Sequence, residues 1–278
     1  MAINRKDYVS AFILGGATAS LVFFLINRRN RLLNFHGLLT IEPPNPSWNP
    51  SHKQPPPFGS KMVPIDPNKI KSAYPLMISS YVPRPIALVS TMSAKGVGNV
   101  APFSFSGVAA HDPPTLVVSV CRKGGKNPLK DTHSNILETK EFVVCTVSEW
   151  FVNAANHTSM ECLEDEDEMA ISGLTPTPSA VVTPPRVAES AMHYECKLVE
   201  TVDVRNAKGE VTATMLLGEV VMFHVNEHLL DLETNADRPR VKLDDYRPVS
   251  RLGGNTYGLT TQVFDVARPP RPPNELKL

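Results

Sequence analysis

The chain has 278 residues, of which 42% are hydrophobic and 20% are charged, so it is long enough to bury a substantial core. Its 28 basic and 28 acidic side chains cancel, which argues against a nucleic-acid-binding protein because such proteins carry a basic surface. Cys121, Cys145, Cys162 and Cys196 form no Cys-x-x-Cys pair, so the sequence predicts no metal site. We interpret Cys121, Cys145 and Cys196 as buried small hydrophobes, because they lie in or at the end of apolar runs.

The N-terminal segment has the composition of a membrane anchor. Residues 8–26 carry no charge, and at about 1.5 Å per residue they just span a hydrocarbon core of about 30 Å. The apolar run reaches Ile26, arginines follow from residue 28, and the cleavage site of a secretory signal is missing, so we expect residues 1–31 to be an uncleaved anchor. Positive charge is heavier after the span, which favours a cytosolic domain, although a mitochondrial membrane also suits these flanks.

A proline-rich stretch separates this segment from the rest of the chain. The prolines between residues 42 and 64 exclude a helix and favour an extended spacer. We therefore predict an anchor at residues 1–31, a linker at 32–64, a folded domain at 65–266 and a proline-rich tail at 267–278.

The folded domain has the pattern of a mainly β protein. Runs rich in β-branched and aromatic residues recur at residues 86–92, 100–105, 115–120, 142–147, 194–204 and 211–225. Residues 93–98 and 205–209 have the composition of tight turns. Because strands do not alternate with long helices, we expect an antiparallel barrel with outer helices at residues 132–139, 149–156 and 161–172. The acidic run 161–168 is interpreted as the solvated face of the last helix, without a catalytic role.

A basic loop follows the third of these strands and leads into a helix. It carries four basic side chains, Arg122, Lys123, Lys126 and Lys130, and ends at Asp131 or Thr132. Free N–H groups and the dipole of a helix N-terminus favour a phosphate at such a place. Ser104, Ser106 and Thr132 add hydroxyl donors. From these residues alone two interpretations stay open: a phosphate-bearing ligand seated on the sheet, or a solvated basic loop beside a helix N-cap.

Several motifs that follow one another in a fixed order make the interpretation of this region more specific. They are Arg84-Pro-Ile-Ala-Leu-Val-Ser90, Asn99-Val-Ala-Pro-Phe-Ser-Phe105, Asp112-Pro-Pro114, Lys130-Asp-Thr132 and Arg251-Leu-Gly-Gly254. In this order, from about residue 64 to residue 266, the chain resembles the flavin reductase-like, FMN-binding split-barrel family, of the flavoredoxin kind.

The resemblance implies an antiparallel Greek-key split β-barrel with peripheral helices, and a homodimer with FMN near the subunit interface. It also implies an FMN-dependent oxidoreductase that moves a hydride from NAD(P)H to bound flavin and passes the electrons to an acceptor. A non-catalytic FMN-binding or electron-transfer module that serves a partner protein remains the alternative. A barrel whose flavin site has decayed is a third interpretation, against which the retained basic loop counts.

Carried over position by position, the resemblance assigns nine residues to the cofactor. The isoalloxazine and ribityl chain would be lined by Ser90, Thr91, Asn99, Ser104, Phe105 and Ser106, and the phosphate would be held by Arg122, Lys130 and Thr132. The segment 251–257 would also approach the flavin. Ser106 and Cys145 depart from the family pattern, which has a second aromatic and an asparagine there. No acid–base catalyst is evident, and His111 and His157 are interpreted as surface histidines.

Overall fold

The computed structural model describes residues 38–50, 52–123, 129–163, 166–232 and 237–269. The chain divides into two compact units: a large one from Ser47 to Thr260, and a small one that joins residues up to Pro46 with those from Thr261 onward. In the small unit, β1 (Leu39–Thr40) pairs in parallel with β16 (Gln262–Val263). The anchor predicted at residues 8–26 lies outside the described residues, and among those described no helix has the length and apolarity needed to cross a membrane.

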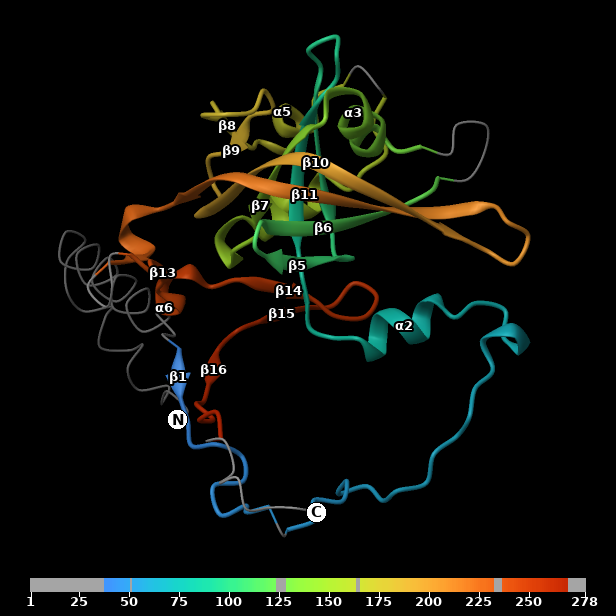
Figure 1. Ribbon diagram of the computed structural model, residues 1–278, viewed down its shortest axis with the longest axis vertical. Helices are drawn as coiled ribbons and strands as arrows, with labels where there is room; N and C mark the ends of the chain where they lie inside the picture. Colours follow the sequence, from blue (N-terminus) through green and yellow to red (C-terminus); the bar gives the residue numbers. More distant parts are fainter. Residues whose placement is uncertain (1–37, 51, 124–128, 164–165, 233–236, 270–278) are drawn as a thin grey trace, which may run out of the picture. The chain divides into compact units, whose positions relative to one another are not determined.

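A seven-stranded antiparallel sheet organises the large unit (Figure 1). Its strands are β3 (Ala87–Met92), β4 (Gly98–Phe103), β5 (Ser106–His111), β6 (Pro114–Cys121), β7 (Glu141–Thr146), β10 (Met192–Arg205) and β11 (Val211–Val225). The spatial order is β4-β3-β7-β10-β11-β6-β5, so the consecutive strands β4 and β5 stand at opposite edges. Only Ser104 and Phe105 join them, so the sheet must curl until its edges approach. The Ser119 N–H donates to the Phe105 carbonyl at 2.8 Å and so extends the pairing of β5 with β6 by one residue. The predicted mainly β split-barrel fold is confirmed.

Shorter elements surround the sheet. The helices are α2 (Tyr74–Ser80), α3 (Asp131–Thr139), α4 (Val152–His157), α5 (Glu168–Ser172) and α6 (Leu243–Tyr246), with 3-10 turns at Pro67–Lys69, Glu149–Phe151 and Glu227–Leu229. A three-stranded sheet has the order β15 (Tyr257–Leu259), β14 (Val249–Arg251) and β2 (Arg84–Pro85). Two small ribbons pair β8 (Pro176–Thr177) with β9 (Arg186–Val187), and β12 (Leu230–Asp231) with β13 (Arg240–Val241).

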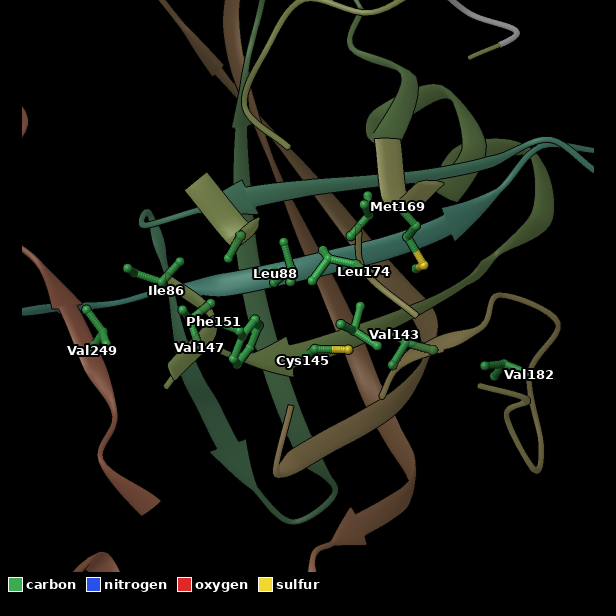
Figure 2. Packing of buried hydrophobic residues seen from close by; sticks show 13 residues of the cluster. Ile86, Leu88, Val143, Cys145, Val147, Phe151, Met169, Leu174, Val182 and Val249 are labelled. Carbon is green, nitrogen blue, oxygen red and sulfur yellow. The ribbon is translucent and has the colours of Figure 1, made fainter. Parts of the chain in front are cut away.

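The sheet buries apolar side chains on both faces, because successive side chains of a strand point in opposite directions. On one face, Leu88 of β3 packs in a cluster with Met169 of α5 and Leu174, and Figure 2 shows this group beside the β7 side chains. On the other face, Val89 joins a cluster with Ile136 of α3 and Phe142 of β7. This second cluster is packed so closely that a Cβ on Gly218 would lie 2.2 Å from the Phe142 ring. Both faces of β3 are therefore fixed by helices, which sets the position of α3 at the sheet edge.

Four local predictions require correction. The helix predicted at 161–172 is only α5, because Asp167 accepts the Met169 N–H at 2.9 Å and so caps a helix that begins at Glu168. The strand predicted at 100–105 ends at Phe103, and the separate strand β5 follows. The helix predicted at 149–156 is divided into a 3-10 turn and α4. Cys121 is exposed rather than buried, because it lies at the end of β6.

Candidate functional site

A polar cleft of about 210 Å³ lies beside the edge strand β4, where α3 begins. The cleft is bordered by alternate residues of β4, by both ends of the basic loop, by the chain that follows α4 and by α5. The lining residues include Asn99, Ala101, Phe103, Lys123, Lys130, Thr132, residues 158–162 and Glu168. Alternate residues of a strand face the same side, which explains why three β4 side chains share one wall.

The start of α3 brings two lysines to the cleft. Lys130 is the N-cap of α3, and its own side chain makes no capping hydrogen bond to the first turn. Lys130 Nζ lies 5.7 Å from the centre of the Phe103 ring, and Lys123 Nζ lies 3.5 Å from Asp131 Oδ2. Two ammonium groups therefore lie near the positive end of the α3 dipole, an arrangement that attracts phosphate, although Asp131 and Glu161 also line the cleft. Lys126 of the same loop lies outside the described residues.

A buried amide–hydroxyl network fixes the start of α3 against the sheet. Asn99 Nδ2 donates to Thr91 Oγ1 at 3.1 Å and to Thr132 Oγ1 at 2.9 Å. Asn135 Nδ2 also donates to Thr91 Oγ1, at 3.1 Å. All four side chains are buried. The structure therefore brings together Thr91, Asn99 and Thr132, three residues that the motifs assigned to the cofactor, and adds Asn135.

Arg122, which was predicted to hold a phosphate, has several protein partners and is not among the residues that line the cleft. Its Nη2 donates to Thr214 Oγ1 at 2.6 Å and lies 3.5 Å from Asp203 Oδ1, both on the β10–β11 hairpin. Its Nη1 contacts His133 Nδ1 on α3. Burial lowers the pKa of His133, and the Arg122 charge lowers it further against the opposing charge of Asp203. A neutral imidazole can accept from the guanidinium, so Arg122 joins α3 to the hairpin.

The remaining predicted residues lie elsewhere. Ser90 is fully buried, and its Oγ has no hydrogen-bond partner among the described residues. Ser104 Oγ accepts a hydrogen bond from Arg84 Nε at 3.4 Å. Phe105 is exposed, and Ser106 lines a separate apolar cleft of about 140 Å³ with β6 and β7. The structure therefore does not gather these four residues around the polar cleft.

The segment 251–257 reaches the cleft only indirectly. The Arg251 guanidinium lies 4.4 Å from the centre of the Tyr257 ring, and the Tyr257 hydroxyl donates to Asn156 Oδ1 at 2.6 Å. Asn156 belongs to α4, and the chain that follows α4 forms one wall of the cleft. The segment thus supports that wall. His157 is exposed, and its Nδ1 lies 3.1 Å from Ser172 Oγ, while His111 is exposed at the end of β5.

Sequence reasoning missed Glu168. This residue is only 6% exposed, and its Oε2 accepts the Val100 N–H of the edge strand β4 at 3.2 Å. The pKa of Glu168 lies above its ordinary value, mainly because the carboxyl is buried. Hydrogen bonds from its own N–H and from the Val100 N–H lower this pKa, and the nearby charges of Asp131 and Asp167 raise it. The only signal in the sequence is that Glu168 stands between a helix N-cap and the apolar Met169, within an acidic run that otherwise reads as solvated.

The curled antiparallel sheet defines a split β-barrel protein, and two lysines at the start of α3 line its polar cleft. The sequence model of the flavin reductase like domain matches residues 79–239. The chain is 38% identical over 199 residues to the uncharacterized protein YwrF of Bacillus subtilis (strain 168), which covers 72% of this chain and 94% of that protein. The chain therefore belongs to the flavin reductase-like family.

Two solved structures agree with this assignment. Nitrilotriacetate monooxygenase component B from Bacillus cereus has 34% sequence identity and a TM-score of 0.70, over 75% of this chain and 100% of that one. The 2-nitrobenzoate 2-nitroreductase NbaA of Pseudomonas fluorescens has 30% identity and a TM-score of 0.66, over 77% of this chain and 100% of that one. Family and neighbours support an oxidoreductase role and make a flavin the expected cofactor.

Proposed function

We propose that the protein is an FMN-dependent NAD(P)H oxidoreductase of the flavin reductase type. The observation that carries the proposal is the polar cleft with two lysines at the start of α3, in a chain of the flavin reductase-like family. A bound flavin supplies the redox chemistry, because it takes a hydride from reduced nicotinamide and delivers the electrons to an acceptor. The chain itself then has to bind the cofactor, orient it and admit the nicotinamide.

The donors of the cleft match a monophosphate. Lys130 and Lys123, the latter paired with Asp131, offer ammonium groups to a phosphate, and the α3 N–H groups and Thr132 Oγ1 add hydrogen bonds. The Asn99–Thr91–Asn135 network holds these groups in place before the ligand arrives. This donor set favours FMN over riboflavin, which has no phosphate.

The homodimer and the membrane anchor belong to the same proposal. Val108 of β5 is 80% exposed, and β5 borders the apolar cleft that contains Ser106. A second subunit would bury such a surface. The anchor at residues 8–26 and the cytosolic orientation rest on the sequence alone, with a mitochondrial membrane as the other location that the charges suit.

The electron acceptor has two candidate classes. One neighbour is named as a monooxygenase component and the other as a nitroreductase, so the electrons would go to a flavin-using partner or to a small nitro compound. The non-catalytic module differs from both, because it would bind FMN without turnover by nicotinamide.

Anaerobic stopped-flow reduction tests the proposal. We expect the purified protein to be yellow with bound FMN, and NADH or NADPH to bleach the flavin band. We expect His111→Ala to change this rate only modestly, because a positioned general acid or base would contribute about a hundredfold or more. Bound FMN that neither nicotinamide reduces would contradict the reductase proposal and favour the binding module.

A further inference from the structure

We infer that Glu168 recognises the hydroxyl groups of the polyol chain that links the phosphate of the cofactor to its ring. The inference rests on the proposed flavin binding and adds a specificity-determining residue to it. It is carried by the presence of the nearly buried Glu168 carboxylate in the same cleft as Lys123, Lys130 and the start of α3.

The cleft presents two kinds of group, which suit different parts of a ligand. Lys123, Lys130 and the N-terminus of α3 are donors, and they suit a phosphate ester, which presents acceptors. Glu168 presents a carboxylate, which accepts hydrogen bonds and repels a phosphate. A hydroxyl-bearing chain next to the phosphate has the donors that this carboxylate needs. An inorganic phosphate would use only the donors of the cleft.

Glu168 is held in position for this role. It is the first residue of α5, directly after the Asp167 cap, and it accepts the Val100 N–H at 3.2 Å. A carboxylate has acceptor sites on both oxygens, so this bond leaves capacity for a ligand. The same β4 strand supplies Asn99 and Ala101 to the wall of the cleft. Glu168 is thus fixed to the strand that lines the site.

The fold does not require a charged side chain at position 168. Among the residues that the structure describes, Glu168 forms no ion pair, although it is only 6% exposed. Burial of a carboxylate without a cation costs free energy, whereas a neutral amide could accept the Val100 N–H equally well. A purely structural role therefore does not require the charge, whereas a carboxylate makes stronger, charge-assisted hydrogen bonds to the hydroxyl groups of a ligand.

The test measures which flavins the full-length protein and its Glu168→Gln variant bind. The probes are riboflavin, which has the hydroxyl chain, and lumiflavin, which has only the ring system. We expect Glu168→Gln to weaken riboflavin about tenfold or more and to leave lumiflavin unchanged, because hydrogen bonds to charged groups are the strong ones. Glu138→Gln, an exposed acid on α3, is the matched control and should change neither affinity.

The outcomes separate this inference from the proposed function. An unchanged ratio of riboflavin to lumiflavin affinity in a folded Glu168→Gln protein overturns the role of Glu168 and leaves flavin binding intact. A parent protein that binds neither FMN nor riboflavin overturns the proposed function itself. Thermal unfolding reports whether the variant folds. If Glu168→Gln does not fold, Glu168→Asp replaces it in the test. This variant keeps the charge on a shorter side chain, and we expect its riboflavin affinity to fall relative to its lumiflavin affinity.

Discussion

Lys130 is the residue of the cleft on which phosphate binding depends most. Its backbone is the N-cap of α3, and its ammonium group lies above Phe103 inside the cleft. We expect Lys130→Ala to weaken FMN binding by about tenfold, because a charge-assisted hydrogen bond contributes about 1.5–3 kcal/mol. Riboflavin affinity should stay the same. Titration of flavin fluorescence measures both, and Lys197→Ala, on the exposed face of β10, is the control. Equal losses for FMN and riboflavin would place Lys130 away from the phosphate.

Arg122 is expected to act on stability rather than on the phosphate directly. Its partners Asp203 and Thr214 belong to the β10–β11 hairpin, so we expect Arg122→Ala to lower the free energy of unfolding by about 1–3 kcal/mol. Asp203→Ala should give a smaller loss, and the double variant should lose less than the sum of the two. Urea unfolding of the three variants provides the measurement. Weakened FMN binding in Arg122→Ala at unchanged stability would restore Arg122 as a phosphate ligand.

Some residues of the candidate site could be predicted from the sequence, and others could not. Asn99, Lys130 and Thr132 were predicted because each lies within a short motif beside a strand end or a helix start. Arg122 lies in the same loop, but its partner Thr214 is 92 positions away, so no local pattern shows that the guanidinium is already bound. Glu168 was missed because an acidic run normally remains in solvent, and only tertiary packing against β4 buries this member.

At the scale of elements, three glutamates organise the irregular chain between α5 and β10. Glu195 accepts the N–H groups of Ala180, Val181 and Val182 at 2.7, 2.6 and 3.0 Å. Glu141 accepts the Thr183 N–H at 2.9 Å, and Glu189 accepts the Thr175 N–H. These carboxylates replace the hydrogen bonds that a regular element would supply, so a segment without long strands keeps a fixed path over the sheet.

Glu195 gives this segment a pH dependence. Burial alone would raise its pKa, but the N–H of Ala180, the His224 imidazole and the neighbouring N–H groups outweigh burial, so the pKa lies below its ordinary value of 4.5. The ionised form therefore stabilises the fold fully above about pH 4.5, and this contribution is lost as the pH falls through the lower folded-state pKa. We expect Glu195→Gln to lower the free energy of unfolding by about 2 kcal/mol at pH 7. Urea unfolding across pH should show the difference shrinking in acid; a constant difference would contradict the assignment.

Elements with strong local signals were predicted, and weak ones were not. The hairpin of β10 and β11 was evident because Asn206 and Gly209 mark its turn, and Asn206 Oδ1 accepts the Lys208 and Glu210 N–H groups. Strand β5 was missed, since Ser106-Gly-Val-Ala-Ala-His has few β-branched residues and only two residues separate it from β4. Its place in the sheet comes from pairing with β6, a tertiary contact.

At the scale of the whole molecule, the barrel depends on a connection that periodicity cannot reveal. The two-residue link between β4 and β5 joins opposite edges of one sheet, and curling follows from this link rather than from any strand's composition. The pattern of strands alone is compatible with several antiparallel topologies. The family motifs resolved the topology because they carry the order of strands as well as their composition.

Removal of residues 1–31 tests how the chain is divided. The strands of the seven-stranded sheet and the residues of the cleft all lie between Ala87 and Val225, and the family match begins at residue 79. We therefore expect the shortened protein to fold, to bind flavin with unchanged affinity and to be absent from the membrane fraction, in which we expect the full chain. Leu14→Asp with Leu21→Asp in the full chain is the matched control. A charge at the centre of a membrane span costs about 2.5–3.5 kcal/mol, so this variant should also leave the membrane while every other residue is kept. Far-ultraviolet circular dichroism and the visible flavin spectrum report on the fold and the site. A shortened protein that neither folds nor binds flavin would show that the N-terminal segment is part of the barrel's structure.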